Sequence, residues 1–289
     1  MKKILAIGIV AILVCGVGLV AAQKSLVANN EISTAKLNKS LNNSNMSKSD
    51  IFNMSEIEER TKGLSEEEMK MKHEEAVKEA QEQYKDAMIE IEKRKEATQN
   101  INDLEKNYAT MRSYYHADYT ADGGDSAEGG SGVGYSDAWT SGNEIHIMSR
   151  AEGPWGEYWA HGRNWDRFTY TSSDHWCKVK IYYHLRGRLM SLGGNNDLQI
   201  HLRVYDRTTG TEIDNKLILS DHGNKYYDAS KTGETQVYLM NGHTYDIELI
   251  GDNEASAWAI SGALADFGYQ EFDGDWRWVK WNHDEVTWV

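Results

Sequence analysis

The chain has 289 residues, a formal net charge of -14 and a single proline. An acidic chain repels phosphate backbones, and no basic patch interrupts its acidity, so the composition argues against nucleic-acid binding. The length suffices for one sizeable domain with accessory segments.

The first 22 residues have the layout of an export signal. Two lysines precede an apolar stretch over 4–22, which ends in small residues before Gln23. We predict cleavage after Ala22, which would leave an exported chain with a charge of -14 - 2 = -16. The alternatives are an uncleaved membrane anchor, because the stretch approaches the roughly 20 residues that span a bilayer, and a lipoprotein attached through Cys15. Each of the three places the protein outside the cell or at its surface.

Residues 23–55 are rich in Asn, Ser and Lys and contain few large apolar side chains. Such a segment buries too little surface to offset its ordering entropy, so we predict a flexible tether. Four Asn-X-Ser sequons make candidate glycosylation sites of Asn38, Asn42, Asn45 and Asn53. An Asn/Ser-rich segment also produces such triplets by chance, and that alternative stays open.

Residues 56–113 are predicted to be helical. Ser55 and Ser65 are each followed three residues later by Glu, which matches a helix capping box, and no Gly or Pro occurs between Glu66 and Arg112. An apolar stripe at heptad spacing runs through Val77, Ala80, Tyr84, Ala87 and Ile91. The stripe is interrupted further on, so both a self-associating coiled coil and a lone or backfolded helix remain open. In either case the segment would act as a spacer or an oligomerisation element.

Residues 114–142 are predicted to be a Gly-rich linker, because six glycines lie among small and acidic residues between 121 and 135. Asp122, Asp125 and Glu128 are the candidate calcium ligands here, but their spacing matches no known calcium loop. No other cofactor is expected.

Residues 143–289 are predicted to form an all-β sandwich with a jelly-roll-like arrangement. Apolar and polar residues alternate over several runs, for example from Cys177 to Arg186, which is typical of half-buried strands. Asn241-Gly242 lies between two such runs and predicts a β-hairpin. Once the signal is removed, Cys177 has no partner for a disulfide and is expected in the core.

All 10 tryptophans lie between Trp139 and Trp288, within or next to this domain. Exposed indole rings beside carboxylates and imidazoles suit sugar rings, and indoles also anchor protein interfaces. The competing interpretation is that the indoles fill the core. On strand periodicity, the candidate ligand-binding residues are Trp155, Glu157, Trp159, His161, Trp276 and Trp278.

Enzyme motifs are weak. A glycosidase requires two carboxylates at the scissile bond, and Glu157 and Asp166 are the nearest acidic residues to the aromatic cluster. His184 and His201 are a candidate metal pair across a sheet, and the common zinc-hydrolase and serine-hydrolase motifs are absent. We therefore expect a non-enzymatic exported protein whose head binds a carbohydrate or a protein partner. The alternatives are a cell-wall-acting glycoside hydrolase and a purely structural surface component.

Overall fold

The computed structural model describes residues 51–98, 108–109, 113–116, 121–268 and 277–289. The chain separates into two compact units, Met1–Ile51 and Phe52–Val289, and the second contains the helices and strands discussed here. The export signal and the sequons at Asn38, Asn42 and Asn45 lie outside the described residues. Among the residues that are described, no helix combines the length and apolar character needed to cross a membrane.

Most of the described residues lie in strands, which pair almost entirely in antiparallel fashion. The strands are β1 Tyr108–Ala109, β2 Ser113–His116, β3 Gly123–Ser141, β4 Glu144–Tyr170, β5 His175–Leu192, β6 Asn195–Asp206, β7 Thr211–His222, β8 Lys225–Leu239, β9 Thr244–Trp258, β10 Gly262–Phe267 and β11 Trp278–Trp288. The predicted all-β sandwich is confirmed at this level.

The sandwich has two layers, and the long hairpin of β3 and β4 belongs to both. Residues 123–132 of β3 pair with 156–165 of β4, whereas 134–141 pair with 144–151. The chain bends between these two stretches, so the two halves of β4 face each other, and a Cβ added at Gly162 would collide with Ile145.

Each layer extends from one half of this hairpin. Strands β9, β6 and β7 follow the second half of β4. Strands β10 and β11 lie end to end beside the first half of β4, and β5 and β8 follow them. Alternating apolar side chains from both layers, such as Val179, Ile181, Leu202 and Leu249, fill the space between them. Cys177 is buried there, as predicted.

The Asn241-Gly242 turn is present, but the predicted hairpin is wrong. Gly242 has a φ of 80°, and His243 N donates to Met240 O at 3.2 Å. Strand β8 nevertheless pairs with β5, and β9 pairs with β4 and β6, so the turn carries the chain from one layer to the other. The local turn chemistry was correctly inferred, but it does not determine which strands pair.

The predicted linker over 114–142 is also wrong, because its glycines lie in β3. Gly123 and Gly129 are the cross-strand partners of Trp165 and Trp159. A Cβ at Gly123 would collide with the Trp165 indole, and one at Gly129 would come within 2.7 Å of the Trp159 indole. The glycines therefore make room for the indoles of β4, and the domain begins before the predicted boundary at residue 143.

Within the described residues, the strands are preceded by helices α4 Met54–Thr61 and α5 Glu66–Thr98. The capping box at α5 is confirmed: Ser65 Oγ accepts from Glu68 N at 3.2 Å, and Glu68 Oε2 accepts from Ser65 N at 2.8 Å. Helix α4 is capped by Asn53 instead of Ser55, and the Asn53 side chain accepts from Glu56 N at 3.4 Å. Glycosylation at the exposed Asn53 stays a prediction.

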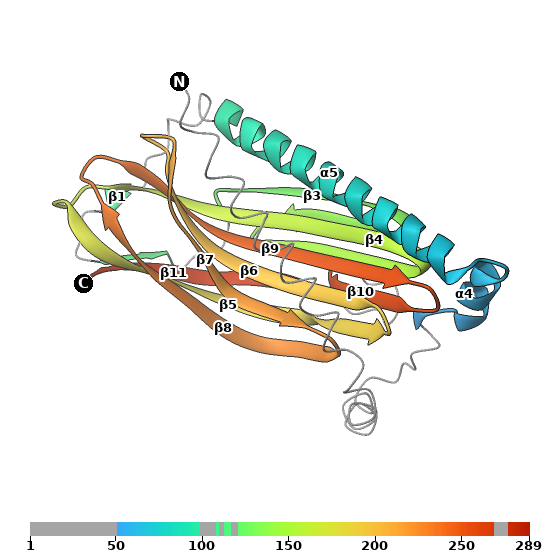
Figure 1. Cartoon of the computed structure of the whole chain (residues 1–289). Coiled ribbons are helices and arrows are strands. Elements are labelled where there is room, and N and C mark those ends of the chain that lie inside the picture. Colours follow the sequence, from blue (N-terminus) through green and yellow to red (C-terminus); the bar gives the residue numbers. More distant parts are fainter. Residues whose placement is uncertain (1–50, 99–107, 110–112, 117–120, 269–276) are drawn as a thin grey trace. The chain divides into compact units, whose positions relative to one another are not determined.

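The predicted coiled coil is not supported, and the helix does not continue to residue 113. Strand β1 lies in the last part of the predicted helical segment, and β2 begins at its final residue. The stripe that suggested a coiled coil faces the chain's own sheet: Ala80 and Ile91 are buried, and α5 contacts β3, β4 and β9 (Figure 1). An apolar stripe identifies the buried side of a helix but not the element that buries it.

Candidate functional site

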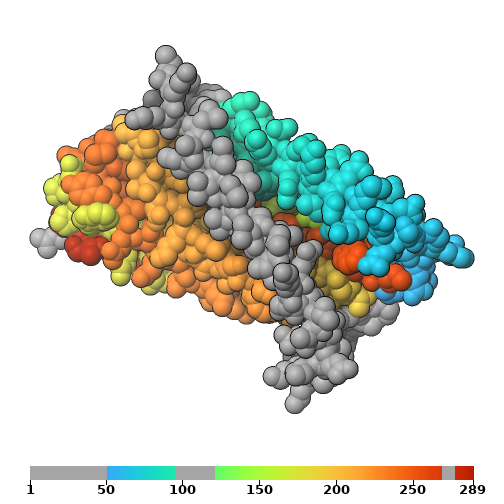
Figure 2. Space-filling view, viewed as in Figure 1, coloured from blue at the N-terminus to red at the C-terminus, as the bar shows by residue number. Residues whose placement is uncertain are grey.

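Helix α5 covers the face of β4 that carries most of the predicted ligand-binding residues. Only 6% of Trp159 is exposed. Its Nε1 donates to the Ala80 carbonyl at 3.0 Å, and Tyr84 packs edge-on against its ring at 5.0 Å between centroids. Figure 2 shows the α5 residues, in blue to teal, covering their part of this surface. This indole holds the helix in place and is not open to a ligand.

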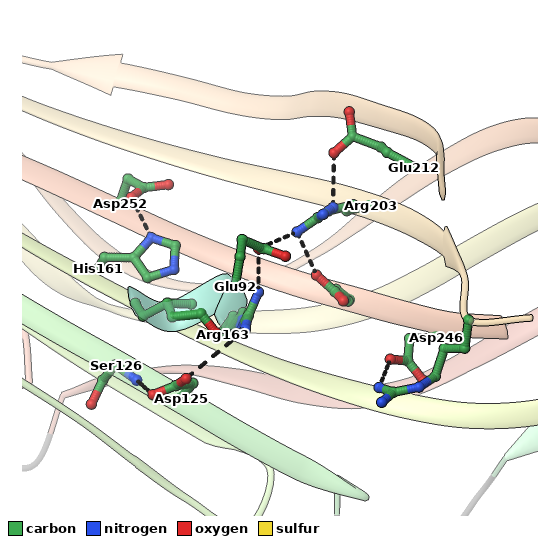
Figure 3. Close-up of polar contacts among 12 residues, drawn as sticks. Glu92, Asp125, Ser126, His161, Arg163, Arg203, Glu212, Asp246 and Asp252 are labelled. Atoms are coloured by element: carbon green, nitrogen blue, oxygen red, sulfur yellow. Dashed lines mark hydrogen bonds and ion pairs between the residues drawn. The ribbon is translucent and has the colours of Figure 1, made fainter. Parts of the chain in front are cut away.

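His161 lies on the same face and is also buried. Its Nδ1 lies 2.7 Å from Asp252 Oδ1, and Tyr84 Oη donates to the same oxygen at 3.2 Å (Figure 3). Burial alone would raise the pKa of Asp252, but His161, with smaller contributions from His201 and Tyr84, holds the pKa below its ordinary value. The three side chains form a polar contact between β4, β9 and α5.

Glu92 of α5 is the centre of a larger ionic network on this face. Its Oε1 accepts from Arg163 Nη1 at 2.8 Å and from Arg203 Nη1 at 3.0 Å (Figure 3). Arg163 also donates to the backbone carbonyl of Ile91 at 3.2 Å, and only 1% of its side chain is exposed. The network joins α5 to β4 and β6.

Glu157 is an acid on this face with a strongly raised pKa. Burial raises its pKa well above the ordinary value, and the adjacent Glu254 carboxyl raises it further, while a hydrogen bond from Ser256 offsets only part of the shift. Only 4% of Glu157 is exposed. Glu157 and Asp166, the two acidic residues near the aromatic cluster, lie an odd number of residues apart on one strand and point to opposite faces.

Trp155 lies at the end of this face nearest to the bend in β4. It is partly exposed, and the Lys72 ammonium of α5 lies 4.6 Å from the centroid of its ring. One face of the indole is therefore already occupied by a cation. Trp155, Glu157, Trp159 and His161 do share a face as predicted, but α5 occupies it.

The residues predicted to bind a metal do not form a metal-binding group within the described part of the chain. The Asp125 carboxylate pairs with Arg94 at 3.0 Å, and Asp122 accepts from Arg167 N at 2.7 Å. No group of three or more metal-ligating residues occurs among the described residues. The predicted metal pair is wrong: His184 and His201 lie in different layers of the sandwich.

The second layer presents an open face formed by β8, β5 and β11, on the side away from α5 (Figure 1). Residues of β5 alternate strictly between buried and accessible from Cys177 to Arg186. The accessible positions carry aromatic, basic and imidazole side chains, and not only small polar side chains. We call this surface the open face; its members on the three strands are Trp176, Lys178, Lys180, Tyr182, His184, Arg186, Tyr226, Asp228, Ser230, Glu234, Tyr238, Trp278, Lys280, His283 and Glu285.

Aromatic rings line the open face, and Tyr226 of β8, the register partner of Arg188, is 54% exposed on it. Three further positions lie along β5 and β11. At one end Trp176 and Tyr238 are 57% and 44% exposed and meet at 5.8 Å between centroids. In the middle Tyr182 stacks on His283 at 4.0 Å with an interplanar angle of 20°. At the other end Trp278 is half-buried.

The Trp278 indole lies between two cations. The Arg186 guanidinium is 5.3 Å from the ring centroid, and the Lys280 ammonium is 5.9 Å from it. Two cations therefore pack against this half-buried indole, whose Nε1 atom is itself buried. Trp278 is the one predicted ligand-binding residue that the structure places on the open face, and Trp276 lies outside the described residues.

Polar groups lie between the aromatic positions. His184 contacts Asp228 at 2.8 Å and Ser230 at 3.2 Å, and Lys280 donates to Glu144 at 2.7 Å. The face therefore offers planar apolar surface together with fixed donors and acceptors. The β5 periodicity shows that Trp176 and Tyr182 share a face, but only the fold shows that no described helix covers it.

No protein-family model and no curated protein matches this chain. Solved structures that resemble it include a carbohydrate-binding module, CBM6, from a laminarinase of Zobellia galactanivorans, at 12% identity over 61% of this chain and 98% of that one, with a TM-score of 0.21. The Necallimastix patriciarum Xyn11A structure is 12% identical in sequence over 54% of this chain and 93% of its own, with a TM-score of 0.26. An Arthrobacter globiformis isomalto-dextranase, solved with panose, is 11% identical in sequence over 62% of this chain and 24% of its own, with a TM-score of 0.23. This chain thus spans about a quarter of the isomalto-dextranase.

Proposed function

We propose that the protein binds carbohydrate through the open face of β8, β5 and β11. The observation that carries this proposal is a row of aromatic rings on one sheet face, exposed at Trp176 and Tyr238 and half-buried at Tyr182 and Trp278, with hydrogen-bonding groups between them. The apolar side of a sugar ring stacks on such a plane, while the hydroxyl groups bond to the neighbouring polar side chains.

Export to the cell surface is part of the same proposal. It rests on the basic start, the apolar stretch and the small residues before Gln23. A binding face for glycans has its ligands outside the cell, and the high negative charge of the chain favours solubility there. A mature N-terminus at Gln23 would support cleavage, and an intact Met1 in the membrane fraction would support an anchor.

A panel of glycans and cell-wall fractions, tested against the full chain, examines the binding proposal. Trp278→Ala and Tyr182→Ala should each weaken binding about tenfold, which corresponds to about 1.4 kcal/mol. Trp258→Ala is the matched control, because this indole is 40% exposed but lies on β9 in the other layer. Equal affinity in all three variants, or binding only to proteins of the panel fractions, would contradict the proposal.

Glycoside hydrolysis is the second candidate, and one observation favours it. Glu157 and Glu254 lie side by side, and the pKa of Glu157 is raised, as for a carboxyl group that acts as general acid. The near-complete burial of Glu157 counts against access to a polymer. Sugar release by the full chain that disappears in Glu157→Gln would favour this candidate over simple binding.

A further inference from the structure

We infer that the ligand of the open face is an uncharged polysaccharide that lies lengthwise along β5 and is bound by its internal sugars. This inference rests on the proposed carbohydrate binding and specifies its substrate class. It is carried by the spacing of the aromatic positions, by the pairing of the charges between them, and by the continuous register of β5 and β8 beneath them.

The aromatic positions lie in one line. Trp176 of β5 is the register partner of Tyr238, Tyr182 is the partner of His283, and Arg186 is the partner of Trp278. From residue 176 to residue 186 a strand extends about 33 Å at about 3.3 Å per residue. One sugar, or two linked sugars, can contact a single aromatic position only, whereas an extended chain contacts all three.

The charged side chains of the open face are balanced. Lys280 pairs with Glu144 at 2.7 Å, and Lys178 lies 3.9 Å from Glu234. Lys180 lies 4.3 Å from the Tyr182 ring, and the nearby Glu285 and Glu234 carboxylates act on it electrostatically.

This balance bears on the charge of the ligand. Recognition of an anionic chain requires a surplus of cations, which this face lacks, and the rest of a chain with a net charge of -14 would repel such a ligand. The face is therefore complementary to a neutral polymer.

The open face is a sheet surface and not an enclosed pocket. The register continues without interruption along β5 and β8 from Trp176 to Arg186, and its accessible side chains all project from the same side of the strands. A surface of this kind has no wall that recognises the end of a chain, whereas small ligands are held in concave sites. Binding should therefore depend on the length of the ligand and not on its terminal sugar.

The test is a titration of the full chain with cello-, laminari- and xylo-oligosaccharides from disaccharide to hexasaccharide, with polygalacturonate as the anionic comparison. Within the series that binds, affinity should rise at least about tenfold from disaccharide to hexasaccharide, which is about 1.4 kcal/mol. Affinity for neutral chains should be nearly unchanged between low and high salt, because no net charge is neutralised.

The Trp176→Ala variant tests whether the polysaccharide lies lengthwise along β5. It should reduce the affinity for the hexasaccharide and leave that for the disaccharide nearly unchanged, because it removes the aromatic position farthest from Trp278. The matched control is again Trp258→Ala, which should follow the unmodified chain at every ligand length.

The outcomes separate this inference from the proposal on which it rests. Equal affinity for disaccharide and hexasaccharide, or a salt-sensitive preference for polygalacturonate, would overturn the inference while leaving carbohydrate binding intact. Failure of every glycan to bind would overturn both.

Discussion

The buried carboxyl of Glu157 has a pKa raised well above its ordinary value by burial and by the neighbouring Glu254. Its side chain is aligned with Trp155 and Trp159 by the two-residue period of β4, which the sequence pattern predicts correctly. Its neighbour Glu254 comes from β9, nearly a hundred residues later, and only the pairing of β4 with β9 brings the two together. The sequence could therefore identify the face of Glu157 but not its partner.

Glu157 makes the stability of the protein depend on pH in a defined direction. Because its pKa is raised in the folded state, the folded protein binds more protons than the unfolded chain, and the free energy of unfolding falls as pH rises from about 4.3 through the raised value. Glu157→Gln should remove this part of the decline, so that the variant becomes the more stable protein at neutral pH. Urea unfolding across a pH series measures it.

The exposed Glu82, whose side chain is 71% accessible, serves as the control for this prediction. Glu82→Gln should reproduce the pH dependence of the unmodified protein. If Glu157→Gln and the unmodified protein decline in parallel as pH rises, the buried carboxyl does not titrate as described.

At the scale of elements, α5 shows which structural information the sequence contained and which it lacked. The capping box at Ser65 and the stripe through Ala80 and Ile91 correctly predicted where the helix starts and which side is buried. They could not show that this side packs on a sheet, because helix and sheet surfaces accept the same apolar stripe. The glycines of β3 were similarly ambiguous, since a linker and a strand packed beneath indoles both favour glycine.

The attachment of α5 depends on Glu92. Glu92→Gln removes the carboxylate between Arg163 and Arg203, and it should lower the free energy of unfolding by about 1–3 kcal/mol, the usual range for hydrogen bonds to charged groups. Glu90→Gln is the matched control, because Glu90 reaches only the exposed Lys93, at 3.9 Å, and should change stability by less than about 0.5 kcal/mol. Equal losses in the two variants, measured by urea unfolding, would show that the network does not hold the helix.

At the scale of the whole molecule, the two layers have outer faces of different character. One outer face is covered by α5 and filled with ion pairs, and the other exposes aromatic rings with paired charges between them. Alternation along β5 predicted two-sided strands, but the assignment of β8 and β9 to different layers depends on contacts between distant segments. As a result, the residues predicted to bind a ligand lie on two different faces. Trp155, Glu157, Trp159 and His161 lie beneath α5, and Trp278 lies on the open face.

The central claim is that the open face, and not the face beneath α5, binds glycan. The most direct measurement is backbone amide chemical-shift mapping of the full chain during titration with the tightest-binding oligosaccharide of the series. We predict that the signals of Trp176, Tyr182 and Trp278 shift with ligand while those of Trp159 and Arg163 stay in place. Shifts centred on Glu157 and Trp159, or no shifts at all, would contradict the account.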